Sequence, residues 1–225
     1  MTTNEPIFGG KTFDAILFDM DGTLLTSIEA TARVWAAWGR SHGLDVETLM
    51  PTIHGVRAID TIRRLNLPGV DPQAEADALL AAEMEDTGGV APIDGALAFV
   101  ASLPPERWAI VTSAPRSLAE RRLGVAGLAP PAVLVTAEDV SRGKPAPDCF
   151  QLAAERLGFR AENCLVCEDA PAGIAGGEAA GAAILVITAT HEHTVETGHP
   201  TTPSYLGLLA QTRADGTIHL TRSAG

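Results

Sequence analysis

The chain has 225 residues, of which 46% are hydrophobic, and it carries a formal net charge of −12. This length and apolar content suffice for one large domain with a buried core, or for a core with a smaller insert. The excess of acidic residues repels nucleic acid and anionic membrane surfaces, so we expect neither as a partner.

The opening segment carries no targeting pattern. Its residues, MTTNEPIFGGKTFD, lack the basic and apolar regions of a signal peptide. No later stretch supplies the roughly 20 consecutive apolar residues that span a bilayer. We therefore expect a cytoplasmic protein.

Five short apolar runs rich in Val, Ile and Leu stop abruptly at polar or acidic residues. Continuous rather than alternating apolar runs predict strands that are covered on both faces. Helical patterns that begin at or just after a proline lie between the later runs. This alternation predicts an α/β fold with a doubly wound parallel sheet. The expected strands are 13–18, 108–111, 132–135, 164–167 and 183–187, and the expected helices are 117–123, 147–157 and 171–180.

A long segment between the first two strands has a helical pattern throughout. A crossover between parallel strands needs only about a dozen residues, so we interpret this segment as an inserted helical subdomain that caps the sheet. We expect a catalytic core formed by residues 1–26 and 92–225 and a helical cap formed by residues 27–91. Trp35 and Trp38 are expected to pack between cap helices rather than to bind a cofactor.

The three cysteines give no disulfide framework. Cys164 and Cys167 form a C-x-x-C pattern, but residues three apart on a strand point to opposite faces. We therefore expect buried thiols there rather than a redox or metal site.

The last part of the chain carries no evident chemistry. Its segment HEHTVETGH contains His191, His193 and His199 without a cysteine or a helical spacing, which favours a polar loop over a zinc site. Beyond it, the sequence predicts a helix and an edge strand or hairpin around Asp215-Gly216.

Polar side chains follow the expected strands at the points where those strands end. In a doubly wound sheet, ligands bind beyond the carboxyl ends of the strands, so we interpret these residues as one site. Each residue alone has an ordinary structural explanation, such as a turn, a helix cap or a solvated charge. Their appearance together at successive strand ends favours a phosphate and magnesium site. They are Asp19, Asp21, Thr112, Ser113, Lys144, Glu168 and Asp169.

The acidic members of this set predict a magnesium site. Asp19 and Asp21 are two residues apart on extended backbone, and like charges so close are costly unless a cation intervenes. Glu168 and Asp169 supply further oxygen ligands of the kind Mg²⁺ prefers. We expect Asp19 and Asp169 to bind the metal directly and Asp21 to bind it through its backbone carbonyl. The sequence leaves open whether Glu168 binds directly or through water.

The remaining members predict phosphate binding. Lys144 supplies a compact cation beside Asp19 and an anionic substrate. Thr112 and Ser113 supply hydroxyl and amide donors for phosphate oxygens, and the sequence leaves open which hydroxyl makes the contact.

These motifs resemble those of the haloacid dehalogenase-like hydrolase superfamily, which consists mostly of phosphatases. DMDGTL matches its first motif, VTS its second, Lys144 in RGKPAPD its third and CEDAPAG its fourth. The resemblance implies that Asp19 forms an aspartyl-phosphate. It also implies that Asp21 protonates the leaving group and then activates water, and that the helical insert is the family's small cap.

A closer resemblance is to sugar and polyol phosphatases, including bacterial hexitol phosphate phosphatases and yeast-type glycerol-3-phosphate and 2-deoxyglucose-6-phosphate phosphatases. IHGVRAID in the cap carries it, together with RWAIVTSAPR, VTAEDVSRGKPAPD and VCEDAPAGIAGGEAAG. It implies a small phosphate monoester as substrate, Mg²⁺ as cofactor, and a leaving group covered by His54, Arg57 and Asp60. Asp94-Gly95 departs from the family's usual Pro-Gly, which we expect to affect stability rather than mechanism.

Several alternative functions share parts of this pattern. A β-phosphoglucomutase-like mutase needs a second anion site in the cap, but the adjacent Arg63 and Arg64 point about 100° apart on a helix. A receiver-type signalling domain has no acid/base two residues after its aspartate, and a dehalogenase needs no metal. A phosphonatase needs a cap lysine, and residues 27–91 contain none. The physiological substrate and the oligomeric state stay open.

Overall fold

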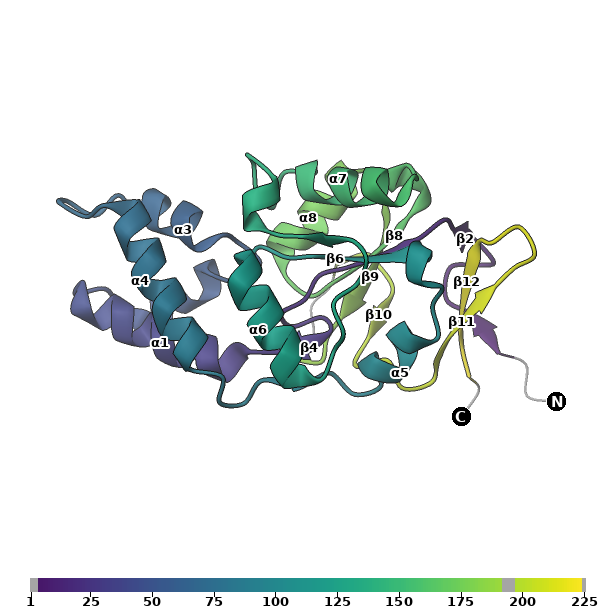
Figure 1. Cartoon of the computed structure of the whole chain (residues 1–225), viewed down its shortest axis with the longest axis horizontal. Coiled ribbons are helices and arrows are strands. Elements are labelled where there is room, and N and C mark those ends of the chain that lie inside the picture. The colour runs from purple at the N-terminus through teal and green to yellow at the C-terminus, as the bar shows by residue number, and fades with distance from the viewer. Residues whose placement is uncertain (1–3, 192–196, 224–225) are drawn as a thin grey trace.

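The computed structural model describes residues 4–191 and 197–223, and a parallel sheet lies at its centre (Figure 1). The six strands of this sheet have the order β10-β9-β8-β3-β6-β7. Strand order reverses at β3, which pairs with both β6 and β8. This reversal is the switch point at which α/β sheets bind ligands. The strands are β3 (Ile16–Phe18), β6 (Trp108–Val111), β7 (Leu134–Val135), β8 (Leu165–Glu168), β9 (Ala183–Ile187) and β10 (Thr201–Thr202).

Helices cover both faces of this sheet. Helices α5 (Ala96–Ala101) and α6 (Arg116–Ala126) lie below it in Figure 1, and α7 (Asp148–Leu157) and α8 (Pro171–Ala179) lie above it. Successive side chains of a strand point to opposite faces, so each strand needs apolar residues at every position. This requirement explains the continuous apolar runs of the sequence.

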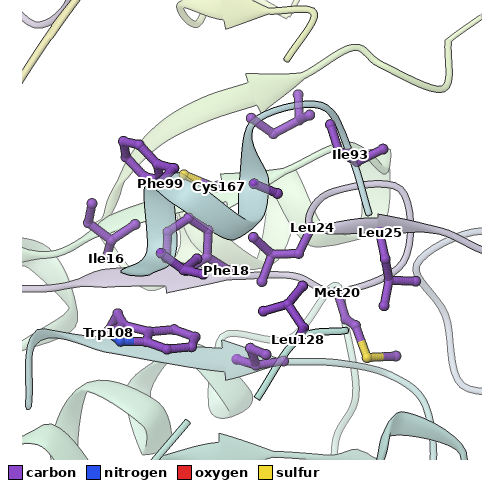
Figure 2. Packing of buried hydrophobic residues seen from close by; sticks show 14 of the residues in the cluster. Ile16, Phe18, Met20, Leu24, Leu25, Ile93, Phe99, Trp108, Leu128 and Cys167 are labelled. Carbon is purple, nitrogen blue, oxygen red and sulfur yellow. The ribbon is translucent and has the colours of Figure 1, made fainter. Parts of the chain in front are cut away.

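The face toward α5 and α6 holds the larger of the two core clusters. Figure 2 shows Phe18 at its centre, with edge-to-face contacts to Phe99 and Trp108 at ring centroid distances of 6.2 and 6.1 Å. Phe18 is fully buried, and truncating such a side chain to alanine typically costs about 3–5 kcal/mol. This packing fixes the strand end that precedes Asp19.

The two cysteines of the C-x-x-C pattern lie on opposite faces of the sheet. Cys167 belongs to the cluster around Phe18, whereas Cys164 belongs to the cluster on the other face. Both are free and buried, and burial raises the pKa of the Cys164 thiol to about 12. Such thiols are poor nucleophiles and poor metal ligands near neutral pH.

The segment predicted as a cap forms four helices at one end of the molecule (Figure 1). They have a small core of their own that includes Trp35 and Trp38, whose rings meet edge to face at 5.5 Å. The chain enters and leaves through an antiparallel pair of short strands, β4 (Leu25–Thr26) and β5 (Ala91–Pro92). The helices are α1 (Ile28–Ser41), α2 (Val46–Leu49), α3 (Ala58–Leu65) and α4 (Pro72–Glu85), and α2 continues into the short 3-10 turn η1 (Met50–Thr52).

A second, antiparallel sheet lies at the other end of the molecule. It contains β11 (Leu208–Thr212) and β12 (Ile218–Arg222), which form the hairpin expected around Asp215-Gly216, and the N-terminal strands β1 (Glu5–Pro6) and β2 (Thr12–Phe13). The helix expected before this hairpin is wrong, because the described residues 197–223 contain none. Gly207 has a φ of +74° there, and a right-handed helix cannot contain that conformation.

Some of the expected boundaries also shift. The strand expected at 132–135 begins only at Leu134. Among the described residues, none of the helices combines the length and apolar composition that a membrane span requires.

Further 3-10 turns are η2 (Pro105–Arg107), η3 (Ala137–Asp139) and η4 (Ala161–Asn163).

Candidate active site

The carboxyl ends of β3, β6 and β8 bring the predicted site residues to one edge of the sheet. Phe18 lies opposite Ile110 and Cys167 in the two neighbouring strands, so the residues that follow each strand are close together. A cavity of about 100 Å³ lies between this edge and the helical segment. The core lines it with Asp19, Asp21, Thr112, Ser113, Leu118, Arg122 and Asp169, and the helical segment lines it with Ser27, Thr31, Trp35, His54 and Glu83, among others.

Lys144 is a buried cation beside Asp19 in this site. Its side chain is 1% exposed, and Nζ donates hydrogen bonds to Asp19 Oδ1 at 2.5 Å, Glu168 Oε1 at 2.8 Å and the Val111 carbonyl at 3.1 Å. Burial works against its charge, but the two carboxylates outweigh that effect and hold the pKa of Lys144 above its usual value. The lysine therefore stays charged.

Three carboxylates cluster beside Lys144, and it donates to two of them. Ligand oxygens of Asp19, Glu168 and Asp169 lie within 4.8 Å of one another, the one such group of metal-ligating side chains in the described part of the chain. Burial raises the pKa of Asp19 to about 7, although the adjacent Lys144 opposes the shift. Burial and the charges of Glu168 and Asp19 likewise hold the pKa of Asp169 well above its usual value. The site carries more negative charge than its protein partners balance, so it fits a divalent cation with oxygen ligands.

Two glycines make room for these carboxylates. A Cβ on Gly22, whose φ is +89°, would lie 2.1 Å from Asp169 Oδ2. A Cβ on Gly173 would lie 1.5 Å from Glu168 Oε1. The glycines of the first and fourth motifs are therefore required by close approach of the acidic side chains, and by backbone conformation at Gly22.

Glu168 accepts three hydrogen bonds from the protein. Its Oε2 accepts the backbone N–H groups of Asp169 and Ala170, both at 2.7 Å, while Oε1 accepts from Lys144. These bonds hold the loop after β8 in the conformation that directs Asp169 toward Asp19. Thr23 adds a hydrogen bond from its hydroxyl to Asp169 Oδ1 at 3.2 Å.

Thr112 and Ser113 both line the cavity but have different partners. The Thr112 hydroxyl oxygen accepts the backbone N–H of Ala114 at 3.1 Å, which leaves its own hydrogen available to a ligand. The Ser113 hydroxyl donates at 2.8 Å to the Gly55 carbonyl in the helical segment. Ser113 therefore links the two parts of the molecule.

Asp21 lies in the same cavity, but its carboxylate is not among the three that cluster. Its Oδ1 accepts from Ser27 Oγ at 2.6 Å and from Arg122 Nη1 at 3.0 Å. Neither Arg122 nor Glu83, which Arg122 also contacts, was indicated by the motifs. One pattern could have indicated Arg122, because it is a single charged residue on the apolar face of α6 formed by Leu118, Ala119, Leu123 and Ala126.

Of the three predicted cap residues, His54 lies apart from Arg57 and Asp60, which contact each other. His54 lines the cavity that contains Asp19, and burial lowers the pKa of its imidazole, so the ring is neutral near pH 7. Arg57 donates instead to the carbonyls of Val140 and Ser141, each at 3.0 Å, and to Asp60 Oδ2 at 2.6 Å. Arg57 and Asp60 do not line this cavity, and their contact with a leaving group stays a prediction.

The histidines considered as zinc ligands have other neighbours. His191 Nε2 lies 2.8 Å from the Asp169 carbonyl oxygen, and His199 Nε2 lies 2.7 Å from Glu178 Oε1. His193 lies outside the described residues. Within the described residues, neither His191 nor His199 belongs to a group that could hold a metal.

Comparison with known proteins gives a consistent result. The sequence model of the family of haloacid dehalogenase-like hydrolases matches residues 13–181. Hexitol phosphatase A of Escherichia coli K12 is 42% identical over 177 residues, which cover 77% of this chain and 82% of the relative. Glycerol-1-phosphate phosphohydrolase 2 of Saccharomyces cerevisiae is 33% identical over 193 residues, which cover 80% of this chain and 76% of the relative.

A solved structure agrees at the level of the fold. The crystal structure of a hydrolase from Pseudomonas syringae has a TM-score of 0.74 at 23% identity and covers 86% of this chain and 96% of its own. The expected α/β fold and the expected superfamily are confirmed. The expected enzyme class, a phosphoric monoester hydrolase, agrees with both named relatives. The chain belongs to the haloacid dehalogenase-like hydrolases.

Proposed function

We propose that this protein is a Mg²⁺-dependent phosphatase of the cytoplasm that hydrolyses small sugar or polyol monophosphates through an aspartyl-phosphate. The observation that carries the proposal is the buried contact of Lys144 with Asp19 at the edge of a cavity, within a cluster of three carboxylates. The relatives named for hexitol phosphate and glycerol phosphate support the substrate class.

The acidic cluster fits the proposed metal. Asp19 and Asp169 would bind Mg²⁺ by their carboxylates and Asp21 by its backbone carbonyl, all oxygen ligands of the preferred kind. Because the carboxylate of Glu168 already accepts three hydrogen bonds, we assign it contact through water. When bound, the metal would supply positive charge that offsets the phosphate and carboxylate oxygens.

Two displacements account for the reaction. Asp19 attacks phosphorus, and the alcohol leaves with a proton from Asp21. Asp21 then takes a proton from the water that attacks the aspartyl-phosphate, the bond from Asp19 to phosphorus breaks, and phosphate leaves. Lys144 balances charge on the nucleophile and on the transferred group throughout. Thr112, whose hydroxyl hydrogen is available, is assigned the side-chain contact to a phosphate oxygen, because the Ser113 hydroxyl already donates to Gly55.

The charges around the cavity favour a leaving group without a second phosphate. Of its described lining residues, Arg122 is the one Lys or Arg side chain, and it is paired with Asp21 and Glu83. Arg63 lies beside Asp60 and Arg64 donates to the Thr52 carbonyl, so neither lines the cavity. A mutase would need a free cation to hold the second phosphate of a sugar bisphosphate. The cavity fits better the hydrolysis of a phosphate ester whose alcohol is an uncharged polyol or sugar.

A phosphate-release screen across monophosphates tests the proposal, run with Mg²⁺ and with the Asp19→Asn variant as control. We expect release from hexitol, hexose or shorter polyol monophosphates and none from the variant. Isomerisation of glucose 1-phosphate in the presence of its bisphosphate, with little phosphate released, would instead identify a mutase.

A further inference from the structure

Arg122 connects the proposed acid/base residue to two helices of the insert. It lies on α6 in the core, is 5% exposed, and donates to groups on three different elements. Nη1 reaches Asp21 Oδ1 at 3.0 Å, while Nη2 reaches Thr31 Oγ1 of α1 at 3.0 Å and Glu83 Oε1 of α4 at 3.1 Å. The guanidinium therefore contacts both parts of the molecule and lines the cavity. Packing alone would not require a charged side chain at this buried position.

The contacts distinguish the two oxygens of Asp21. Both hydrogen bonds that its side chain accepts from described residues, from Ser27 and from Arg122, end on Oδ1. An acid that gives its proton to a leaving oxygen must present one carboxyl oxygen to the substrate, in hydrogen-bond reach. With Oδ1 held by Ser27 and Arg122, Oδ2 accepts no hydrogen bond from the described residues and is left for a substrate.

The charges allow this arrangement without an unpaired buried cation. The carboxylate of Glu83, which is also buried, neutralises the formal charge of Arg122. A buried arginine is tolerated when its donors are satisfied and its charge is paired. Because Thr31 and Glu83 belong to the helical insert, the guanidinium has all three partners only when insert and core are together as in this structure.

We propose that Arg122 is a positioning residue: it fixes Asp21 by Oδ1, presents Oδ2 to the leaving-group oxygen, and makes this orientation depend on the helices of the insert. The inference rests on the proposed phosphatase function and deepens it. In the first displacement, the proton on Asp21 Oδ2 passes to the ester oxygen as the bond from that oxygen to phosphorus breaks and the bond from Asp19 to phosphorus forms.

The choice of leaving group separates this role from a structural one. An alkyl oxygen needs a proton as it departs, whereas p-nitrophenolate departs as a stable anion. The ratio kcat/KM reports steps up to departure of the leaving group, so the later role of Asp21 as a base does not enter. Loss of Arg122 should therefore harm an alkyl ester far more than p-nitrophenyl phosphate.

The experiment measures kcat/KM for sorbitol 6-phosphate and p-nitrophenyl phosphate in wild type, Arg122→Gln, Arg122→Lys, Asp21→Asn and the double variant Arg122→Gln/Asp21→Asn. Arg121→Gln, an exposed neighbour on the same helix, is the matched control. We expect Arg122→Gln to lose about 10-fold to 100-fold on the alkyl ester, the scale of a misplaced catalytic group. The loss on p-nitrophenyl phosphate should stay within about twofold, and Arg122→Gln should cost at most about twofold more in the Asp21→Asn background.

Two results would overturn the inference. Equal losses of kcat/KM on both substrates would mean that Arg122 only supports the fold or the insert. If Arg122→Gln lowered kcat/KM as much in the Asp21→Asn background as in wild type, Arg122 would not act through Asp21. If Arg122→Gln does not fold, Arg122→Lys decides, because one ammonium cannot reach all three partners and should show the same substrate selectivity. Wild type that hydrolyses no alkyl monophosphate would contradict the proposed function itself, and the inference would fail with it.

Discussion

Lys144 reaches Asp19 from a loop far along the chain, and Nζ lies 2.5 Å from Asp19 Oδ1 and 2.8 Å from Glu168 Oε1. The lysine therefore has a second carboxylate partner that does not depend on Asp19. Replacing Asp19 should remove the proposed nucleophile without leaving the buried ammonium unpaired.

Asp19→Asn is accordingly predicted to abolish phosphate release while the protein stays folded. The measurement is phosphate release with Mg²⁺ together with thermal unfolding, and Asp94→Asn, an exposed carboxylate, serves as the control. Folded Asp19→Asn protein with near-normal turnover would remove Asp19 from the mechanism.

Asp21→Asn is predicted to separate the two displacements. With p-nitrophenyl phosphate the first step needs no acid, so one equivalent of nitrophenolate should appear per enzyme. Hydrolysis of the aspartyl-phosphate should then slow by about 10²-fold to 10⁴-fold, because the base is lost. Rapid-quench kinetics measure both phases. A variant with unchanged steady-state turnover would show that Asp21 has no acid/base role.

Removal of the metal should abolish phosphate release and lower the thermal stability of the protein. We expect EDTA to stop phosphate release and Mg²⁺ to restore it. Mg²⁺ should also raise the melting temperature, because a ligand that binds the folded state stabilises it and here relieves repulsion among Asp19, Glu168 and Asp169. Asp169→Asn should reduce this shift in melting temperature. Full activity in metal-free buffer would contradict the ligand set.

Arg57 is predicted to hold the insert closed over the cavity. It lies next to α3 and donates to the Val140 and Ser141 carbonyls of the core. These contacts favour a closing role over the leaving-group contact that the resemblance implies. Arg57→Ala should then raise KM or lower kcat for sorbitol 6-phosphate and p-nitrophenyl phosphate alike, because both need the closed site. Arg63→Ala, on the same helix and exposed, is the control. A loss confined to sorbitol 6-phosphate would instead support direct contact with leaving-group hydroxyls.

The turn that receives Arg57 should be sensitive to acid. Partial burial of Asp139 works to raise its pKa, but hydrogen bonds from Arg156 and Thr136 outweigh that effect and lower the pKa to about 2. The folded pKa lies below the unfolded one, so this carboxylate stabilises the fold above about pH 4 and the contribution disappears as the pH falls to about 2. The difference in melting temperature between wild type and Asp139→Asn should therefore be large at pH 6 and shrink toward pH 2. A difference that stays constant would contradict the assignment.

The sequence predicts correctly that the residues at the strand ends lie close together, because strand topology determines their positions. Asp19, Thr112 and Glu168 follow apolar runs, and parallel strands bring such positions to one edge whatever the details of packing. The sequence did not predict the partners of Arg57, because they are the backbone carbonyls of Val140 and Ser141. Every residue has such a carbonyl, so the residue types give no indication of these contacts. The expected helix near the C-terminus failed because an apolar run there includes Gly207 in a left-handed conformation.

The ribbon of β4 and β5 has a consequence for how such a chain acquires its specificity. Thr26 and Ala91 are directly paired, so the core holds the ends of the insert at the separation of two neighbouring strands. A two-residue Asn-Gly turn would close the same ribbon as an ordinary hairpin. The helical segment thus takes the place of the loop of a hairpin. The entropic cost of closing a loop rises only slowly with its length. We therefore expect that the whole segment can be exchanged while Asp19 and the strand that carries it stay in place.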